Sequence, residues 1–170
     1  MLSRTTKRLL TAIALLSLAA AVFCGWWGSS LPLEHVTAVL SAGDTVYGID
    51  QGETEYRFFH TDETGALLGE IRRDVRDGGA YRTYDCLTLD GETLYVLERR
   101  ADIQSDLIQS ETVYRCNFDK QRLEAVWELP VVDPAMDSNF SVQVRSGAVT
   151  FFQADYTGRW ATGQLMTMGA

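Results

Sequence analysis

From residue 35 to residue 152 the chain is a succession of short, largely apolar stretches separated by turns that contain Gly, Asp and Thr. Short stretches of this kind, bounded by turn residues, are typical of β-strands. The pattern predicts strands at residues 35–40, 45–50, 55–60 and 66–71, and again at residues 84–89, 93–98, 112–118 and 123–129. Strands this close in sequence pair most simply as antiparallel hairpins. We therefore predict an all-β fold.

The predicted strands recur as a repeat. The stretch "GDTVY", residues 43–47, matches "GETLY", residues 91–95, at an offset of 48. A second match joins "YRFFHTDETGALLGEI", residues 56–71, to "YRCNFDKQRLEAVWEL", residues 114–129, at an offset of 58 and implies a ten-residue insertion in the second copy. A weaker third copy begins with "NFSVQVRSGAVTFF", residues 139–152. Periods of about 40 to 50 residues made of short strands are typical of β-propeller blades.

A glycine stands between the first two predicted strands of each copy, at Gly43, Gly91 and Gly147. A two-residue hairpin turn requires positive φ angles, which glycine adopts without steric cost. The strands that follow the first two turns contain "TVYGI" and "TLYVL", with apolar residues at consecutive positions. Both faces of such strands must be covered, and neighbouring blades provide that cover.

Two stretches resemble known propeller families. "LDGETLYVL", residues 89–97, resembles the strand pairs of YVTN-type propellers, and "TDETGALLGEI", residues 61–71, resembles the Thr-Gly turn and following strand of quinoprotein-like (PQQ-like) propellers. The PQQ-like motif has a Trp four residues after its Gly, and Gly69 holds that position here. Trp127 holds the aligned position of the second copy, where Arg122-Leu123 replaces the Thr-Gly pair. The resemblance implies a fold but no particular activity, because propellers serve as enzymes, scaffolds and binders.

The resemblance implies about three four-stranded antiparallel blades, at residues 34–73, 82–130 and 139–170. Closed propellers have roughly 4 to 8 blades. We therefore expect an incomplete propeller that is an N-terminal fragment or a truncated product, or that pairs with another chain. The alternative is a two-sheet β-sandwich whose similar hairpins share only their turn chemistry.

The first 30 residues have a different pattern and form a predicted segment of their own. Three basic residues, Arg4, Lys7 and Arg8, precede an apolar run at residues 9–27 that holds 19 residues without a charge. As a helix this run is roughly 28 Å long, close to the thickness of the hydrocarbon core of a bilayer. Because basic residues stay on the inner side of a membrane, the rest of the chain is expected outside the cytoplasm.

Two interpretations of this segment remain open. A single-pass anchor of the cell membrane is supported by Trp26 and Trp27, since paired indoles at the end of an apolar helix suit the membrane interface. A cleaved secretory signal, after which the protein is secreted, is supported by the small residues Ala19 and Ala21. The membrane is a predicted partner in the first interpretation only.

The chain has 170 residues, of which 46% are hydrophobic and 22% charged, a composition typical of a globular domain. Without the three basic residues of the N-terminal segment, 12 of the 15 basic residues remain against 23 acidic ones, a net charge of −11. This charge disfavours nucleic acid as a partner, because binding to its phosphates requires cationic contacts.

Few residues suggest chemistry. The two histidines, His35 and His60, fall at strand ends without partners at the spacing of a Ser-His-Asp triad or a metal site. We therefore predict no catalytic residue, no metal site and no cofactor. Cys86 and Cys116 fall on the first and third strands of the second copy, so one strand separates them. This separation is too large for a disulfide, and we expect free thiols.

The predicted connections differ in length between the two ends of the strands. Short turns lie at one end, whereas long loops at residues 72–82, 100–110 and 130–139 lie at the other. Six arginines fall in or beside these loops: Arg72, Arg73, Arg76, Arg82, Arg99 and Arg100. Guanidinium groups bind carboxylate and phosphate, so this face is predicted to bind a small anionic ligand or a protein. Acidic residues are interleaved with the arginines, and pairing between them at the surface is the alternative.

These features favour an exported, membrane-tethered propeller segment that acts as a binding or sensing module. Two alternatives remain. One is the N-terminal part of a propeller enzyme, a hydrolase or quinoprotein-type oxidoreductase, with its catalytic groups in other blades. The other is a structural assembly module.

Overall fold

The computed structural model of the chain describes residues 35–155 and 162–169. The chain divides into two units, Met1–Pro32 and Leu33–Ala170, and every described strand belongs to the second. Over the described residues the fold is all β, with twelve strands and no helix. Within this part of the chain, accordingly, no helix has the length and apolar character needed to span a membrane. The predicted anchor or signal segment, with its tryptophan pair, lies outside the described residues and stays a prediction.

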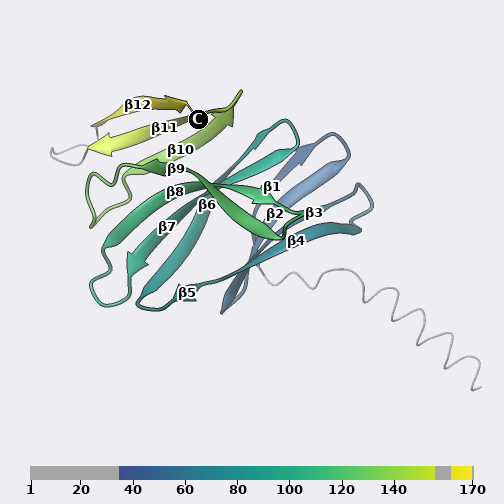
Figure 1. Ribbon diagram of the computed structural model, residues 1–170, viewed down its shortest axis with the longest axis horizontal. Helices are drawn as coiled ribbons and strands as arrows, with labels where there is room; N and C mark the ends of the chain where they lie inside the picture. The colour runs from purple at the N-terminus through teal and green to yellow at the C-terminus, as the bar shows by residue number, and fades with distance from the viewer. Residues whose placement is uncertain (1–34, 156–161, 170) are drawn as a thin grey trace, which may run out of the picture. The chain divides into compact units, whose positions relative to one another are not determined.

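The strands form three antiparallel sheets, each with its strands in chain order (Figure 1). Sheet A consists of β1 (Val36–Ala42), β2 (Thr45–Gln51), β3 (Glu55–Thr61) and β4 (Leu67–Asp74). Sheet B consists of β5 (Arg76–Asp77), β6 (Ala80–Asp90), β7 (Thr93–Asp102), β8 (Ile108–Asn117) and β9 (Arg122–Leu129). Sheet C consists of β10 (Asn139–Arg145), β11 (Ala148–Asp155) and β12 (Thr162–Gly169). Each strand predicted from the sequence overlaps an observed one, and β5 is an addition that the pattern did not predict.

The predicted glycine turns are confirmed. Gly43, Gly91 and Gly147 join β1 to β2, β6 to β7 and β10 to β11, with φ angles of 57°, 62° and 73°. A residue with a Cβ atom is strained in this left-handed region, whereas glycine is not. The three turns therefore set the register of the three leading hairpins.

Sheets A and B pack against each other through a shared hydrophobic cluster. Tyr47 and Ile49 of β2 and Phe58 of β3 belong to it, together with Leu94 and Val96 of β7. Alternate residues of a strand point to the same face, which is why each strand contributes side chains two positions apart. Full burial of a Leu, Val or Phe side chain contributes about 1.5–3 kcal/mol to the free energy of unfolding.

The other face of sheet B packs against sheet C through a second cluster. Leu97 of β7, Val113 of β8 and Trp127 of β9 meet Val149 and Phe151 of β11 there. Strand β7 thus buries apolar side chains on both of its faces, as its consecutive apolar residues predicted. Sheet B is the middle layer of three.

The two described cysteines are free, as predicted. Cys86 lies on β6 and Cys116 on β8, with β7 between them in the sheet. They also belong to different layers: Cys116 is buried in the cluster between sheets A and B, and Cys86 packs against the cluster between sheets B and C. Opposite faces of one sheet exclude a disulfide between them.

The second repeat match has a different register from the one predicted. His60 lies opposite Tyr47 in sheet A, and Arg115 lies opposite Tyr95 in sheet B. Since Tyr95 follows Tyr47 by 48 positions and Arg115 follows His60 by 55, the insertion between them is seven residues and not ten. The predicted offset of 58 is therefore wrong by three, an odd number that turns every aligned side chain to the other face of its sheet.

The same shift corrects the comparison of Gly69 with Trp127. Gly69 lies opposite His60 on β3, whereas Trp127 lies opposite Val113 on β8, two residue pairs further along the sheet. Trp127 packs on Tyr95, with ring centroids 5.8 Å apart. Gly69 has a different environment, described below, and the two residues are not equivalent.

Two of the three predicted long loops are shorter than expected. Strand β4 continues to Asp74, β5 follows, and β6 begins at Ala80, so most of residues 72–82 is strand. Likewise, β7 and β8 leave only residues 103–107 between them. The apolar pattern stops at the charged residues, so the strands were predicted to end there. Backbone pairing does not depend on side-chain polarity, and the strands continue through these residues. Only the connection at residues 130–138 has the expected length.

Candidate functional site

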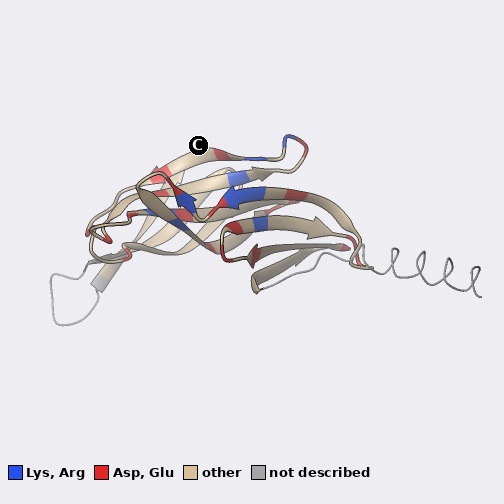
Figure 2. Ribbon diagram, turned by 90° about the horizontal axis from the view of Figure 1, so that it is seen from below, with Lys and Arg blue, Asp and Glu red and all other residues tan. Residues whose placement is uncertain are grey.

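The six arginines predicted to form an anion-binding face are dispersed over the sheets. Arg72 and Arg73 lie in β4, Arg76 in β5, Arg82 in β6, and Arg99 and Arg100 in β7. Consecutive residues of a strand point to opposite faces, so the arginine pairs of β4 and β7 are each divided between two faces. Figure 2 shows basic and acidic positions spread over the strands and turns, without a separate basic face. The six lie on strands and not in loops, and their predicted role in anion binding stays a prediction.

Two of these arginines meet a buried carboxylate between sheets A and B. Glu98 of β7 is 4% exposed, and its Oε2 lies 3.5 Å from Nε of Arg82 and 4.0 Å from Nη2 of Arg73. The hydroxyl of Tyr84 donates a hydrogen bond to the same carboxylate. Burial and the charge of Glu98 raise the pKa of Tyr84, so the phenol keeps its proton. A carboxylate at this depth requires such partners, because an unpaired buried charge costs several kcal/mol.

A second buried ion cluster joins sheets B and C. Nε of Arg99 donates a hydrogen bond of 2.8 Å to Oε1 of Glu111, and the guanidinium also contacts Asp85 and donates to the backbone oxygen of Asn139. The side-chain amide of Asn139 in turn donates to Glu111. Arg99 and Glu111 are 6% and 1% exposed. These groups cross-link two sheets and leave little of the guanidinium open to a ligand.

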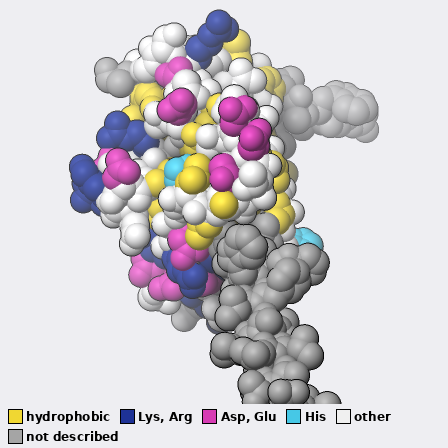
Figure 3. All heavy atoms as spheres, turned by 90° about the vertical axis from the view of Figure 1, so that its right-hand side faces the viewer, with side chains coloured by type: hydrophobic (Ala, Val, Ile, Leu, Met, Phe, Trp, Pro, Cys, Tyr) yellow, Lys and Arg dark blue, Asp and Glu magenta, His cyan; other side chains and the backbone are white. Residues whose placement is uncertain are grey.

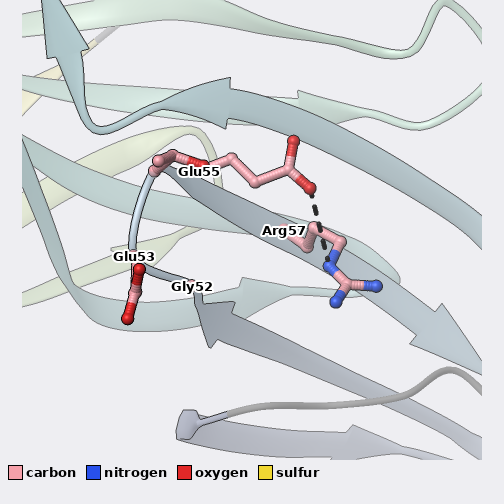
Figure 4. A pocket seen from close by; sticks show the side chains of 5 residues that line it. Gly52, Glu53, Glu55 and Arg57 are labelled. Atoms are coloured by element: carbon pink, nitrogen blue, oxygen red, sulfur yellow. Dashed lines mark ion pairs between the residues drawn. The ribbon is translucent and has the colours of Figure 1, made fainter.

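A polar recess of about 430 Å³ lies at the β2–β3 turn, lined by Gly52, Glu53, Thr54, Glu55 and Arg57 (Figure 4). Oε1 of Glu55 lies 4.0 Å from Nε of Arg57, and Glu53 points away from this pair. Nη2 of Arg57 also lies 3.2 Å from Oδ2 of the buried Asp50. Arg57 is therefore already paired with Asp50 and Glu55, which makes this recess a weak candidate for an anion site.

A second recess, at the hairpin ends of sheets A and B, is the stronger candidate. We call it the aromatic recess; it measures about 450 Å³ and is lined by Tyr47, His60, Glu92, Thr93, Arg115, Cys116, Asn117, Phe118 and Asp119. Tyr47 and His60 lie on β2 and β3 of sheet A, and Phe118 is the first residue after β8 of sheet B. In Figure 3, a histidine on this side of the molecule is surrounded by hydrophobic and acidic side chains.

Three aromatic rings form one wall of the aromatic recess. The His60 imidazole stacks on Phe118 with ring centroids 4.2 Å apart and an interplanar angle of 29°. Tyr47 lies beside His60, with centroids 5.7 Å apart and an interplanar angle of 16°. The hydroxyl of Tyr47 donates a hydrogen bond of 3.0 Å to the backbone oxygen of Glu92, which ties sheet A to the β6–β7 turn of sheet B. The wall is thus held by contacts from both sheets.

Gly69 of β4 makes room for this stack. A Cβ atom at Gly69 lies 2.6 Å from Nε2 of His60 and 3.4 Å from Cβ of Phe118. The first distance is far inside van der Waals contact, so any side chain at this position displaces the imidazole. The absence of a side chain at Gly69 is therefore a condition for the His60–Phe118 stack.

The charge around the aromatic recess is mainly negative. Glu92 and Asp119 are exposed at its rim. Burial lowers the pKa of His60, and the charge of Asp119 opposes that effect, so the imidazole is mostly neutral at pH 7. Burial, together with the charge of Glu92, raises the pKa of Tyr47. The site therefore presents neutral aromatic faces beside two carboxylates.

This arrangement suits ligand binding better than covalent chemistry. Cys116 lines the recess, but burial raises the pKa of its thiol, so the nucleophilic thiolate is scarce at neutral pH. Among the described residues, no group of three or more His, Cys, Asp or Glu side chains could hold a metal ion. Partly exposed stacked rings beside carboxylates are features of a recognition site.

Sequence reasoning missed this site. His60 was interpreted as an ordinary strand-end residue, and Phe118 only as the end of a strand. The available signal was Gly69, which interrupts the apolar pattern of β4 and departs from the PQQ-like motif. The sequence does not show that Phe118, which follows a strand of sheet B, lies next to Gly69 of sheet A.

Comparison with known proteins adds one distant relative. No family model matches the chain, and no solved structure matches it significantly. A protein of Streptococcus mutans serotype c (strain ATCC 700610 / UA159), described only as uncharacterized, is 28% identical over 94 residues. The match covers 55% of this chain and 20% of the relative, so the chain spans about a fifth of that protein's length.

Proposed function

We propose that the chain is an extracytoplasmic binding module, built as a segment of a β-propeller and tethered to a membrane by its N-terminal apolar run. The observation that carries the proposal is the aromatic recess, a cavity of about 450 Å³ with walls from sheets A and B. Cavities between packed layers with a few convergent polar groups are frequent ligand sites. The recess is the binding site in this proposal.

The propeller assignment is supported by the two separate core clusters. A two-sheet sandwich has one core between its sheets, whereas here sheet B packs on sheet A through one face and on sheet C through the other. Sheets A and C each follow chain order from strand to strand, as the strands of propeller blades do.

The extracytoplasmic placement is supported by the sequence. Three basic residues precede an uncharged run long enough to cross a bilayer, and the remainder of the chain has a net charge of −11. A binding module tethered in this way samples solutes at the outer surface of the cell.

A ligand screen on the full chain in detergent micelles tests the proposal. NMR signals of the His60 imidazole and the Phe118 ring report on the recess directly, and we expect a bound compound to shift both. Binding should be lost in Phe118→Ala and retained in Phe152→Ala, which removes an exposed phenyl ring from β11 in sheet C. Equal affinity of the two variants, or a broad screen without any binder, refutes the recess as a binding site.

A further inference from the structure

We propose that the aromatic recess binds a small organic cation of the alkylammonium class. The inference rests on the proposed function, since it names the ligand of the same site. Three observations carry it: the aromatic wall, the two rim carboxylates, and the ion pair that already engages the arginine of the recess.

The aromatic wall leaves part of its ring surface exposed to a cation. Phe118 and His60 are both only partly buried, and neutral His60 extends the π surface of the phenyl ring without adding positive charge. A cation within about 6 Å of an aromatic centroid gains roughly 0.5–1 kcal/mol at an exposed site and more when it is desolvated. Alkylammonium groups combine a positive charge with apolar surface. The apolar surface suits the aromatic wall, and the charge suits the rim carboxylates.

The rim carboxylates supply the negative charge. Glu92 projects from the β6–β7 turn and Asp119 from the β8–β9 turn. Among the described residues neither of them forms a salt bridge, in contrast to the carboxylates of the two buried ion clusters. A cation in the recess therefore meets two carboxylates without displacing an existing partner.

Arg115 is the one arginine among the described residues that line the recess, and it already has an acidic partner. Its guanidinium is paired with Glu124 of β9. Hydrogen bonds from Arg115 and Arg122 hold the pKa of Glu124 at about 2, so this carboxylate stays charged at ordinary pH values. Arg115 thus repels an incoming cation less than an isolated arginine does. For the same reason it attracts an anion only weakly.

Other ligand classes fit the recess less well. An anion is repelled by the carboxylates of Glu92 and Asp119, and the guanidinium of Arg115 is already paired with Glu124. A neutral apolar ligand covers the same rings but gains nothing from the carboxylates, and it removes water from both of them. A cation of alkylammonium type gains both from the aromatic wall and from the two rim carboxylates.

Titration of the full chain with choline and with its neutral carbon isostere, 3,3-dimethyl-1-butanol, tests the inference. NMR shifts of His60 and Phe118 report binding, at low ionic strength because salt screens the rim charges. We expect choline to bind at least several-fold more tightly than the isostere. Equal binding of the two overturns the cation inference and leaves the binding module intact. If neither binds while the screen yields an anionic or other ligand, the inference also fails alone; if no compound of any class binds, both proposals fail.

Variants that each remove one negative charge test whether the rim carboxylates contribute to choline binding. Asp119→Asn and Glu92→Gln should each weaken choline binding about two- to fivefold and leave binding of the isostere unchanged. Glu53→Gln, at the β2–β3 turn outside the aromatic recess, is the matched control and should leave choline binding unchanged. All three side chains are exposed, so the melting temperature should not move. Unchanged choline binding in both rim variants overturns the inference.

Discussion

His60 and Phe118 stack with their ring centroids 4.2 Å apart, although they are 58 positions apart in the sequence. This separation equals the offset of the second repeat match, which makes the two residues equivalents in the sequence alignment. In the structure they are partners instead: His60 extends from sheet A and Phe118 from the end of β8 in sheet B. Their contact is one wall of the aromatic recess.

Replacement of Gly69 by Ala should weaken this contact. The new Cβ lies 2.6 Å from Nε2 of His60, and we expect the free energy of unfolding to fall by about 1–3 kcal/mol. Gly79→Ala is the matched control, because a Cβ at Gly79 meets no heavy atom within 4 Å. Urea denaturation of both variants measures the difference. Equal stability of the two variants contradicts the role assigned to Gly69.

Stability should depend on the protonation of His60. Burial lowers the pKa of His60 below the ordinary value of 6.5, with Asp119 opposing. Below about pH 6.5 the unfolded chain therefore binds a proton that the folded chain does not, and stability falls as the pH decreases toward the folded pKa. The fall should be smaller in His60→Gln and unchanged in His35→Gln. Urea midpoints at several pH values measure it, and a His60 that titrates at or above 6.5 by NMR contradicts it.

Strand positions were predictable because their signals are local. Gly43, Gly91 and Gly147 mark hairpin turns by their backbone requirement alone, and the two-residue period of the flanking strands follows from the pleat. Register in the second repeat was not predictable in this way. The sequence does not show the exact length of a loop insertion. The resulting error of three residues aligned Gly69 with Trp127.

The site was less predictable than the fold because its contacts are not local. The partners of Arg99 include Glu111 on the next strand and Asn139 in another sheet, so no loop pattern could show that this arginine is buried. In the same way, the recess depends on the juxtaposition of His60 and Phe118 from two sheets. The sequence carries the residues but not their distances.

Removal of a charge from the ion cluster between sheets B and C should lower the free energy of unfolding more than removal of a surface charge. Arg99→Met leaves Glu111 buried without its cationic partner, and we expect a loss of about 3–5 kcal/mol in the free energy of unfolding. Arg122→Ala removes an exposed arginine from Glu124 and should cost only about 0–1 kcal/mol. Chemical denaturation compares the two variants. A loss below 1 kcal/mol in Arg99→Met rules out the cluster as a cross-link.

Cys86 and Cys116 should remain thiols in the mature protein. In a Cys24→Ser variant, unfolding without reductant should expose two reactive thiols per chain. In the folded protein Cys116 should react slowly with alkylating reagents, since burial raises the pKa of its thiol. Mass spectrometry before and after alkylation measures both. An intact mass two units lower, with no alkylation after unfolding, indicates a disulfide and contradicts the strand order.

The apolar N-terminal run should be retained as a membrane anchor. Its 19 uncharged residues match the bilayer core, and Trp26 and Trp27 suit the interface at its end. We expect the expressed protein to sediment with membranes, to resist extraction by high salt, and to be digested by protease added outside intact cells. Exchange of Trp26 and Trp27 for Ser should leave this fractionation unchanged, because the apolar run alone supplies most of the insertion energy. N-terminal sequencing distinguishes the alternative: a soluble protein that begins at Val22 establishes signal cleavage and removes the tether from the proposed function.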